Sequence, residues 1–211
     1  MYRLAVAASV LLAGCSSISG DAPLRQRLDD ATGATVTTLA SPLVFYREQS
    51  LLAANARDYI YIGPVEVNRN GRRQYLLWVA YRSTIDRAGS AGFTAPAQTY
   101  LLLDGEPMDL PVATSMDRPQ AGTHTLPGAD EAEWLYQTSV GGGESVLFEV
   151  TRAQLLTIAR AREVRIITAE SAASAVQYEP WRTPATDFVD FSRYLKGDPT
   201  SRLALATEPG E

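Results

Sequence analysis

The sequence predicts an α+β fold, made mainly of antiparallel strands in a sandwich-like or curved sheet, with two short packed helices. Short runs of alternating apolar residues, separated by turn signals, predict the strands, whereas only two segments carry clear helix start signals. The chain holds a single cysteine, so no internal disulfide stabilises it. Its length is sufficient to bury an apolar core within one domain.

The clearest turn signal is Asn70-Gly71, the dipeptide that favours a type I′ hairpin turn, between two strand-like runs. With this turn Arg69 faces Arg72 across the hairpin, and Arg73 follows directly. Like charges that face each other are mildly unfavourable, so these arginines are candidates for contact with an anionic partner, such as lipid headgroups or a carboxylate-rich surface. The alternative is a charged turn that is simply solvated.

The two runs that flank this turn differ in pattern. Gly63-Pro64 interrupts the alternation of the first run, which predicts a bulge or a bend. Residues 75–81 of the second run are apolar at successive positions. This second pattern predicts a central strand that is covered on both faces.

Tyrosines recur in the same two runs. Tyr59 and Tyr61 alternate onto one face and, with Tyr75 or Tyr81, could form an aromatic contact surface. The alternative places these half-buried rings in the core and at its rim.

A second hairpin is predicted around Asp104-Gly105. Pro107 and Pro111 fall at positions whose missing N–H groups would point away from the partner strand, so the second strand of this hairpin is expected to lie at a sheet edge. Further strands are predicted at 133–140 and 145–150, joined across the glycines at 141–143, and then from residue 164 and around residue 178.

Two helices are predicted in the last third of the chain. Thr151 and Gln154 form a capping-box signature ahead of a short helix. The last helix, at about 184–196, has apolar residues at helical spacing and Gly197 beyond its end. That apolar stripe, made of Phe188, Phe191 and Leu195, is expected to pack on a sheet face.

The chain begins with the pattern of an export signal. MYRLAVAASVLLAGC contains one cation, Arg3, then an uncharged apolar run and two small residues. The apolar run is about half as long as the roughly 20 residues that a membrane-spanning helix needs. It therefore predicts a segment that is removed after export.

The motif Leu12-Ala13-Gly14-Cys15 resembles the lipobox of bacterial lipoproteins. This resemblance covers about the first 17 residues, and it implies that Cys15 becomes the first residue of the mature chain and carries lipid on its sulfur and its amine. In that family an aspartate after the cysteine tends to retain the protein in the inner membrane. Ser16 therefore implies the outer membrane, with the domain facing the periplasm.

These signals divide the chain into four parts. The expected parts are a signal peptide (1–14), a lipidated N-terminus and spacer in which 23–31 could form a short helix (15–33), a single globular domain (34–196) and a loose tail (197–211).

Charge and composition exclude several kinds of partner and cofactor. The formal net charge is −5, and it becomes −6 when Arg3 is removed with the signal segment, so the basic surface that nucleic acid requires is not expected. His124 is the only histidine, and one histidine without a cysteine in the mature domain cannot form a structural zinc site. We therefore expect no metal, no cofactor and no catalytic residue.

The function expected from these features is a non-catalytic structural or binding role in the cell envelope, at a membrane reached through lipid on Cys15. The partner would be another envelope protein or an anionic surface. One alternative is an envelope hydrolase whose carboxylates are brought together only by the fold. Another is a carrier of a small ligand, which an interior filled by Trp78, Phe188 and Phe191 would exclude.

Overall fold

The computed structural model describes most of the chain between residues 23 and 205. The described residues are 23–30, 32–51, 54–85, 96, 98–111, 135, 136, 138, 139, 144–169, 174–181, 185–197 and 203–205.

The fold is α+β and mainly antiparallel, which confirms the fold class predicted from the sequence. The described residues form eleven strands and two helices. In chain order these are β1 (Leu24–Asp29), β2 (Ala34–Leu39), β3 (Leu43–Glu48), β4 (Arg57–Arg69), β5 (Arg72–Ser83), β6 (Gln98–Leu103), β7 (Glu106–Asp109), β8 (Ser145–Glu149), α1 (Arg152–Arg160), β9 (Val164–Ala169), β10 (Val176–Pro180), α2 (Ala185–Leu195) and β11 (Leu203–Leu205).

The long strand β4 organises the sheet. One of its edges pairs with β5 from Asp58 to the hairpin turn, and β8 pairs with the far edge of β5. The other edge of β4 is divided between two strands: β3 pairs with residues 57–62, and β2 pairs with residues 65–68. From β2 the sheet continues through β1 to β11, and from β3 it continues through β10, β9 and β6 to β7.

Gly63-Pro64 lies where β4 changes partner from β3 to β2. The bulge predicted there is wrong, because the pairing with β5 runs unbroken through Gly63 opposite Trp78 and Pro64 opposite Leu77. Residues that flank a two-residue turn are hydrogen-bonded to each other, and bonded positions then alternate along the strand. By this alternation the missing N–H of Pro64 faces the divided edge, so the β5 ladder loses no donor.

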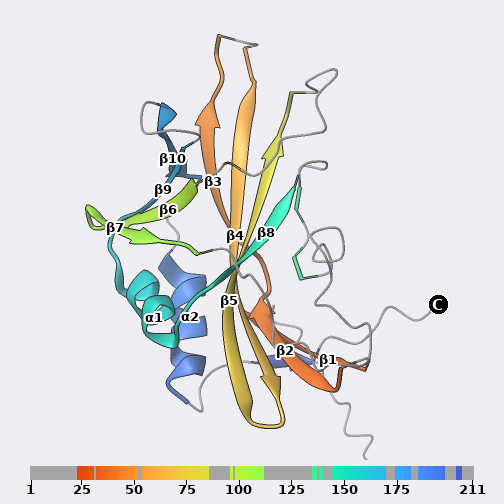
Figure 1. Cartoon of the computed structure of the whole chain (residues 1–211). Helices are drawn as coiled ribbons and strands as arrows, with labels where there is room; N and C mark the ends of the chain where they lie inside the picture. The colour runs from red at the N-terminus through yellow and green to blue at the C-terminus, as the bar shows by residue number, and fades with distance from the viewer. Residues whose placement is uncertain are drawn as a thin grey trace, which may run out of the picture.

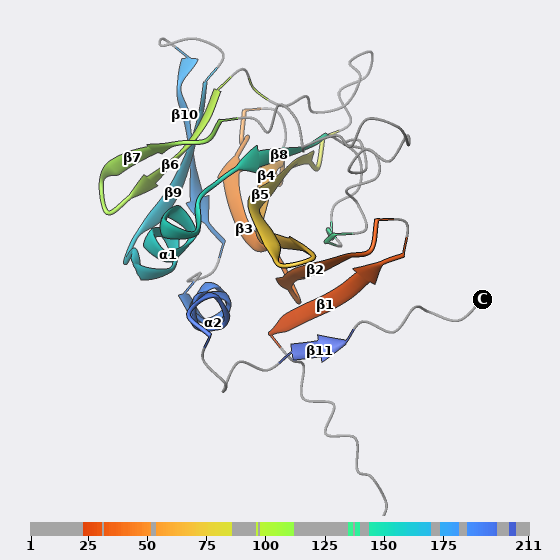
Figure 2. The same cartoon turned by 60° about the horizontal axis from the view of Figure 1, so that its bottom comes forward.

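The helices fill the space between two parts of the curved sheet. Figures 1 and 2 show α1 and α2 lying side by side, between the β6–β7–β9–β10 part and the strands β4 and β5. The residues they bury are Leu155 and Ile158 from α1 and Phe188, Phe191 and Leu195 from α2. The predicted apolar stripe of the last helix is therefore confirmed.

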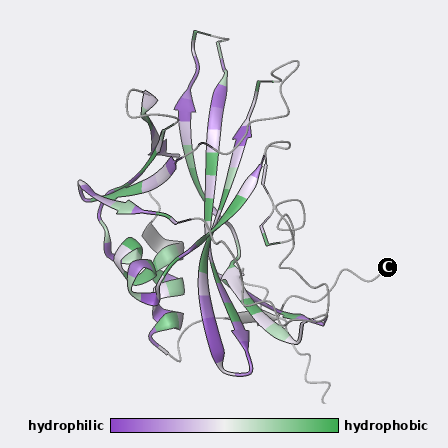
Figure 3. Cartoon of the chain, viewed as in Figure 1, coloured by the Kyte–Doolittle hydropathy of each residue, from purple (hydrophilic) through white to green (hydrophobic). Residues whose placement is uncertain are grey.

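The core of the domain is continuous and apolar. Trp78, Tyr81 and Phe45 are fully buried in it, and β5 is buried from residue 76 to residue 82, as expected for a central strand covered on both faces. Figure 3 shows hydrophobic residues along the middle of the long strands and hydrophilic residues at the tip of the β4–β5 hairpin. Trp78, Phe188 and Phe191 all belong to this core. These are the side chains whose presence in the interior would exclude a carrier of a small ligand.

The local signals for turns and caps are confirmed. Both residues of the first turn have positive φ, with 51° at Asn70 and 85° at Gly71. In the second hairpin Leu103 pairs with Glu106, and β7 ends the sheet order as predicted for an edge strand. At α1 the capping box is present, because the amide of Gln154 donates to the Thr151 hydroxyl while the amide of Thr151 donates to the Gln154 side chain.

Three regions differ from the sequence-based expectations. Residues 24–29, expected within a spacer that could be helical, form strand β1, and residues 203–205, expected in a loose tail, form β11, which pairs with β1 in parallel. Leu24 and Leu28 lie four positions apart, a spacing that fits a helix and a strand equally, so pairing with β2 decides the conformation. The strand predicted at 133–140 is wrong for the described positions 135, 136, 138 and 139, which are not in a strand.

Candidate functional site

The three arginines proposed from the sequence lie at the tip of the β4–β5 hairpin. Arg69 and Arg72 are opposite each other across the turn, as predicted, and the amide of Gly71 donates to the Asn68 side chain at 3.0 Å. Arg72 and Arg73 are exposed, whereas Arg69 is half-buried and its Nε atom has no hydrogen-bond partner. The tip therefore presents positive charge at one end of the long hairpin (Figure 1).

The three guanidinium groups do not converge on one point. Side chains alternate between the two faces of a strand, so Arg69 and Arg72 share one face, while Arg73 belongs to the other. Arg73 leans toward Glu66 on that second face, with 3.7 Å between its Nε and Oε1 of the carboxylate. Of the pair that shares one face, Arg72 is thus the exposed member, and Arg73 on the other face is exposed but partly neutralised by Glu66.

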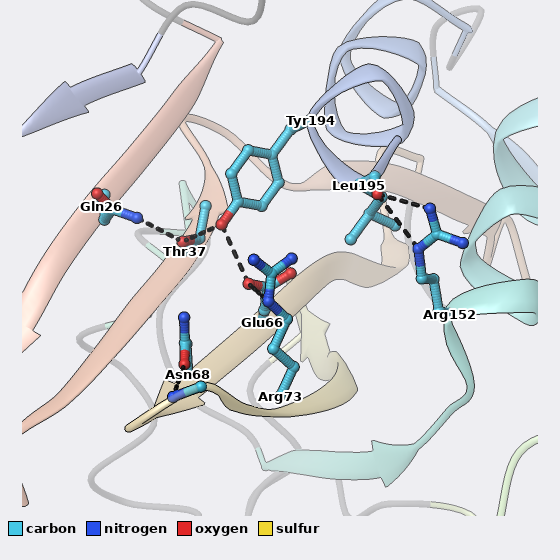
Figure 4. Close-up of polar contacts among 9 residues, drawn as sticks. Gln26, Thr37, Glu66, Asn68, Arg73, Arg152, Tyr194 and Leu195 are labelled. Carbon is cyan, nitrogen blue, oxygen red and sulfur yellow. Dashed lines mark hydrogen bonds and ion pairs between the residues drawn. The ribbon is translucent and has the colours of Figure 1, made fainter. Parts of the chain in front are cut away.

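Glu66 is the buried member of a polar group beneath the tip. Its side chain is fully buried, and its Oε1 accepts a hydrogen bond from the hydroxyl of Tyr194 at 3.1 Å. The same hydroxyl lies 3.3 Å from the hydroxyl of Thr37, which accepts from the Gln26 amide at 3.2 Å. Figure 4 shows these side chains converging from β1, β2, β4 and α2, while Oε2 of Glu66 has no hydrogen-bond partner.

Burial controls the proton affinity of this group. Desolvation raises the pKa of the Glu66 carboxyl above its ordinary value, whereas Arg73 and the Tyr194 hydroxyl lower that pKa and offset part of the effect. Burial also raises the pKa of Tyr194, and the charge of Glu66 raises the pKa of Arg73. Glu66 therefore holds a proton more readily than an exposed glutamate does.

The Glu66 group connects helix α2 to the sheet. Tyr194 extends from the last turn of α2 to Glu66 on β4, and Arg152 at the start of α1 donates to the carbonyl oxygen of Leu195 at 2.7 Å. Glu66 thus contacts a tyrosine and an arginine, and neither supplies the second carboxylate that a general acid–base pair for glycoside hydrolysis needs. The arrangement suits a structural tie that orients Arg73.

Sequence reasoning did not find Glu66 or Tyr194. Glu66 alternates with Val65 and Val67, a pattern typical of a strand with one solvated face, whereas in the fold its side chain is buried and contacts Tyr194 and Arg73. A signal was present at Tyr194, which follows Phe191 by three positions and so lies near the apolar stripe of its helix.

The tyrosines of β4 form an aromatic contact with different partners from those expected. Tyr59 packs against Trp181 with 5.9 Å between ring centroids, and Trp181 also contacts Tyr46 at 5.1 Å. Tyr75 and Tyr81 on β5 pair with even-numbered residues of β4. They therefore lie on the other face of the sheet from Tyr59 and Tyr61. The guanidinium of Arg57 lies 5.0 Å from the Trp181 ring, so this cluster already contains its own cation.

Several candidate residues lie outside the part of the chain that the structure describes. Cys15 and His124 are among them. Within the described residues, no group of three or more histidine, cysteine, aspartate or glutamate side chains is placed to hold a metal ion.

Comparison of the chain with family models, curated proteins and solved structures gives no match. Among the described residues, no helix combines the length and the apolar character that crossing a membrane requires.

Proposed function

We propose that this chain is a lipoprotein of the bacterial cell envelope, anchored through Cys15 in the outer membrane and facing the periplasm. Its domain would have a non-catalytic role, either structural or in binding another envelope component. The observation that carries the proposal is the motif Leu12-Ala13-Gly14-Cys15, placed directly after a short apolar run with one preceding cation. Several acyl chains on this cysteine would hold the domain at the membrane almost permanently, since each buried CH₂ contributes about 0.8 kcal/mol.

The binding role is favoured over catalysis by the character of the polar groups in the fold. The buried acid with a raised pKa, Glu66, contacts Tyr194 and Arg73 and ties a helix to the sheet. The exposed charge at the hairpin tip, by contrast, lies at the end of two strands that are paired along their whole length. Such a display suits recognition of a negatively charged partner.

Substitution of the cysteine tests the anchor. Cells grown with labelled palmitate are expected to label the natural chain, whereas Cys15→Ala should abolish labelling and release the domain from the outer-membrane fraction. Ser17→Ala is the matched control, because it changes a neighbouring small residue and leaves the motif intact. Retention of Cys15→Ala in the outer-membrane fraction would overturn the proposal.

The position after the cysteine tests the membrane assignment separately. Ser16→Asp should remain labelled with palmitate but move to the inner-membrane fraction, as the lipoprotein resemblance implies. Fractionation by density would distinguish the two membranes. A labelled Ser16→Asp chain that stays in the outer membrane would contradict the sorting part of the proposal and leave the anchor itself intact.

The binding role needs a test of its own. In-cell crosslinking followed by purification of the lipidated chain should recover a specific envelope component. Recovery of no such component under several growth conditions would count against a binding role.

A further inference from the structure

Charge is distributed unevenly over this acidic protein. The chain carries a formal net charge of −5, yet the tip of the β4–β5 hairpin contains three arginines and no acidic residue. The β6–β7 hairpin is the reverse: residues 98–111 include Asp104, Glu106 and Asp109 and no lysine or arginine. The two hairpin tips point in different directions from the core (Figure 1).

Further cations lie around the arginine tip. Arg25 and Arg27 are exposed on β1, and Arg27 is in register with Val67 of β4, two positions from Arg69. Arg27 and Arg69 lie two strands apart across the sheet and two residues apart along it. These spacings separate their backbones by roughly 12 Å.

Helix α2 ends beside the same group. Lys196 is exposed at that end, and the nearby Tyr194 reaches Glu66, which precedes Arg69 by three residues in β4. Lys196 is also the only lysine of the chain. We call this group, made of Arg25, Arg27, Arg69, Arg72, Arg73 and Lys196, the cationic end.

Acidic side chains at the cationic end offset only part of this charge. Glu66 is buried against Arg73. Asp29 accepts a hydrogen bond from Thr32, and Asp30 is exposed in the turn after β1. Even without Arg27, the other five cations outnumber Glu66, Asp29 and Asp30, so positive charge remains in excess among the described residues of this end.

The proposed lipid attachment point is close to the cationic end along the chain. Cys15 precedes Leu24, the first residue of β1, by nine positions, and a fully extended chain of that length spans at most about 32 Å. Leu24 pairs with Leu39, which follows Thr38 opposite Val65, so the tether enters near the middle of the thirteen-residue strand β4 and does not by itself favour either end of that strand. The tether thus brings the β1 side of the domain near the membrane.

We propose that the cationic end docks on anionic phospholipid headgroups of the membrane that holds the lipid on Cys15, which fixes the orientation of the domain. This inference rests on the proposed lipid anchor. Each lysine or arginine near an anionic membrane surface strengthens the attraction roughly fivefold, and the effect fades within a Debye length. The acidic β6–β7 hairpin is repelled by the same surface, so both ends favour one orientation.

Site-specific fluorescence tests the orientation. In the mature lipidated chain Cys15 is acylated, so a cysteine introduced by Gln74→Cys or by Glu48→Cys is the only free thiol for a fluorophore. Gln74 lies beside the arginine tip, and Glu48 lies at the opposite end of β4 on strand β3. With a headgroup quencher in vesicles of phosphatidylglycerol and phosphatidylcholine, position 74 should be quenched at least several times more strongly than position 48.

Matched charge variants assign the effect to the hairpin tip. The double variant Arg69→Gln, Arg72→Gln should reduce quenching at position 74 to the level found at position 48. The control Arg160→Gln, Arg162→Gln removes the same charge from exposed residues at the end of α1 and should leave quenching unchanged. Vesicles of phosphatidylcholine alone, or 0.5 M salt, should also abolish the difference, and circular dichroism would verify that each variant is folded.

The possible failures are distinct. The docking proposal would be overturned, and the anchor left intact, by equal quenching at positions 74 and 48 in a palmitate-labelled sample. Quenching that is the same with and without anionic lipid would have the same meaning. Absence of palmitate label would overturn both. Crosslinking from position 74 to an acidic protein in cells, without preferential quenching in vesicles, would assign the tip to a protein partner and would also overturn membrane docking.

Discussion

The hydroxyl of Tyr136 donates a hydrogen bond to the carbonyl oxygen of Pro64 at 2.7 Å and accepts one from the amide of Leu39 at 3.0 Å. It thereby supplies partners to backbone groups at the place where the edge of β4 passes from β3 to β2. The ring also lies against Gly63, so that a Cβ atom there would approach it to 2.2 Å. A side chain thus completes the sheet where the two strands leave a gap.

Gly63→Ala is expected to be strongly destabilising. The added methyl group would overlap the Tyr136 ring within a packed core, and overpacking of this kind should lower the free energy of unfolding by about 3 kcal/mol. Denaturant unfolding would measure the loss. In a Tyr136→Ala background the same substitution should cost much less, and an equal cost in both backgrounds would contradict the proposed overlap.

Tyr136→Phe tests how much the Tyr136 hydroxyl alone contributes to stability. It should lower the free energy of unfolding by about 1–3 kcal/mol, because the amide of Leu39 and the carbonyl of Pro64 lose a partner in a buried place. Tyr61→Phe is the matched control, since the Tyr61 hydroxyl bonds the exposed Ser139, where water can replace it. Similar losses for both variants in chemical denaturation would argue against a special role for Tyr136.

Glu66→Gln is expected to change how stability depends on pH. Because burial raises the pKa of Glu66 in the folded state, its contribution is fully present below its ordinary value of 4.5 and is lost as pH rises through the folded-state pKa. The natural chain should therefore lose stability relative to Glu66→Gln as pH rises from 4.5 toward neutral. Denaturant unfolding at a series of pH values measures the difference, with Glu149→Gln, whose side chain is exposed at the end of β8, as control; identical profiles for the two variants would refute the assignment.

Thr151→Ala tests the helix cap. Loss of the hydroxyl that accepts from the Gln154 amide should lower the free energy of unfolding by about 1 kcal/mol. Thr157→Ala provides the contrast, because Thr157 is exposed within α1 and alanine has the higher helix propensity, so that variant should be neutral or slightly stabilising. Thermal or chemical unfolding of both variants checks the opposite signs, and equal losses would contradict the cap.

Local signals were sufficient for the hairpins, the capped helix and the central strand. Asn70-Gly71 and Asp104-Gly105 determine their turns through the φ values they tolerate, and the register follows from the turns. The sequence was also sufficient to predict that the three arginines are divided between two faces of the sheet, since Arg72 and Arg73 are adjacent in a strand. The exposed part of the candidate site was therefore predictable.

The parts that sequence reasoning missed depend on contacts between distant residues. Tyr136 lies 72 positions from Pro64, and its neighbours resemble a strand in composition, so nothing local indicated that it would complete the gap beside β4. Glu66 is buried where Tyr194, from the distant helix α2, reaches it. Strand β1 likewise depends on its partners, because its two leucines fit a helix and a strand equally well.

The pairing of β1 on both edges has a mechanical consequence. If Cys15 is held in a membrane, any pulling force on the domain enters at Leu24, whose backbone lies between β2 on one side and β11 on the other. The residues nearest the point where the force enters, Leu24–Gln26, are thus the ones that pair with a neighbouring strand on both edges. A force along the strand would have to shear several hydrogen bonds together rather than peel them in turn, so β1 would resist a force applied at Leu24.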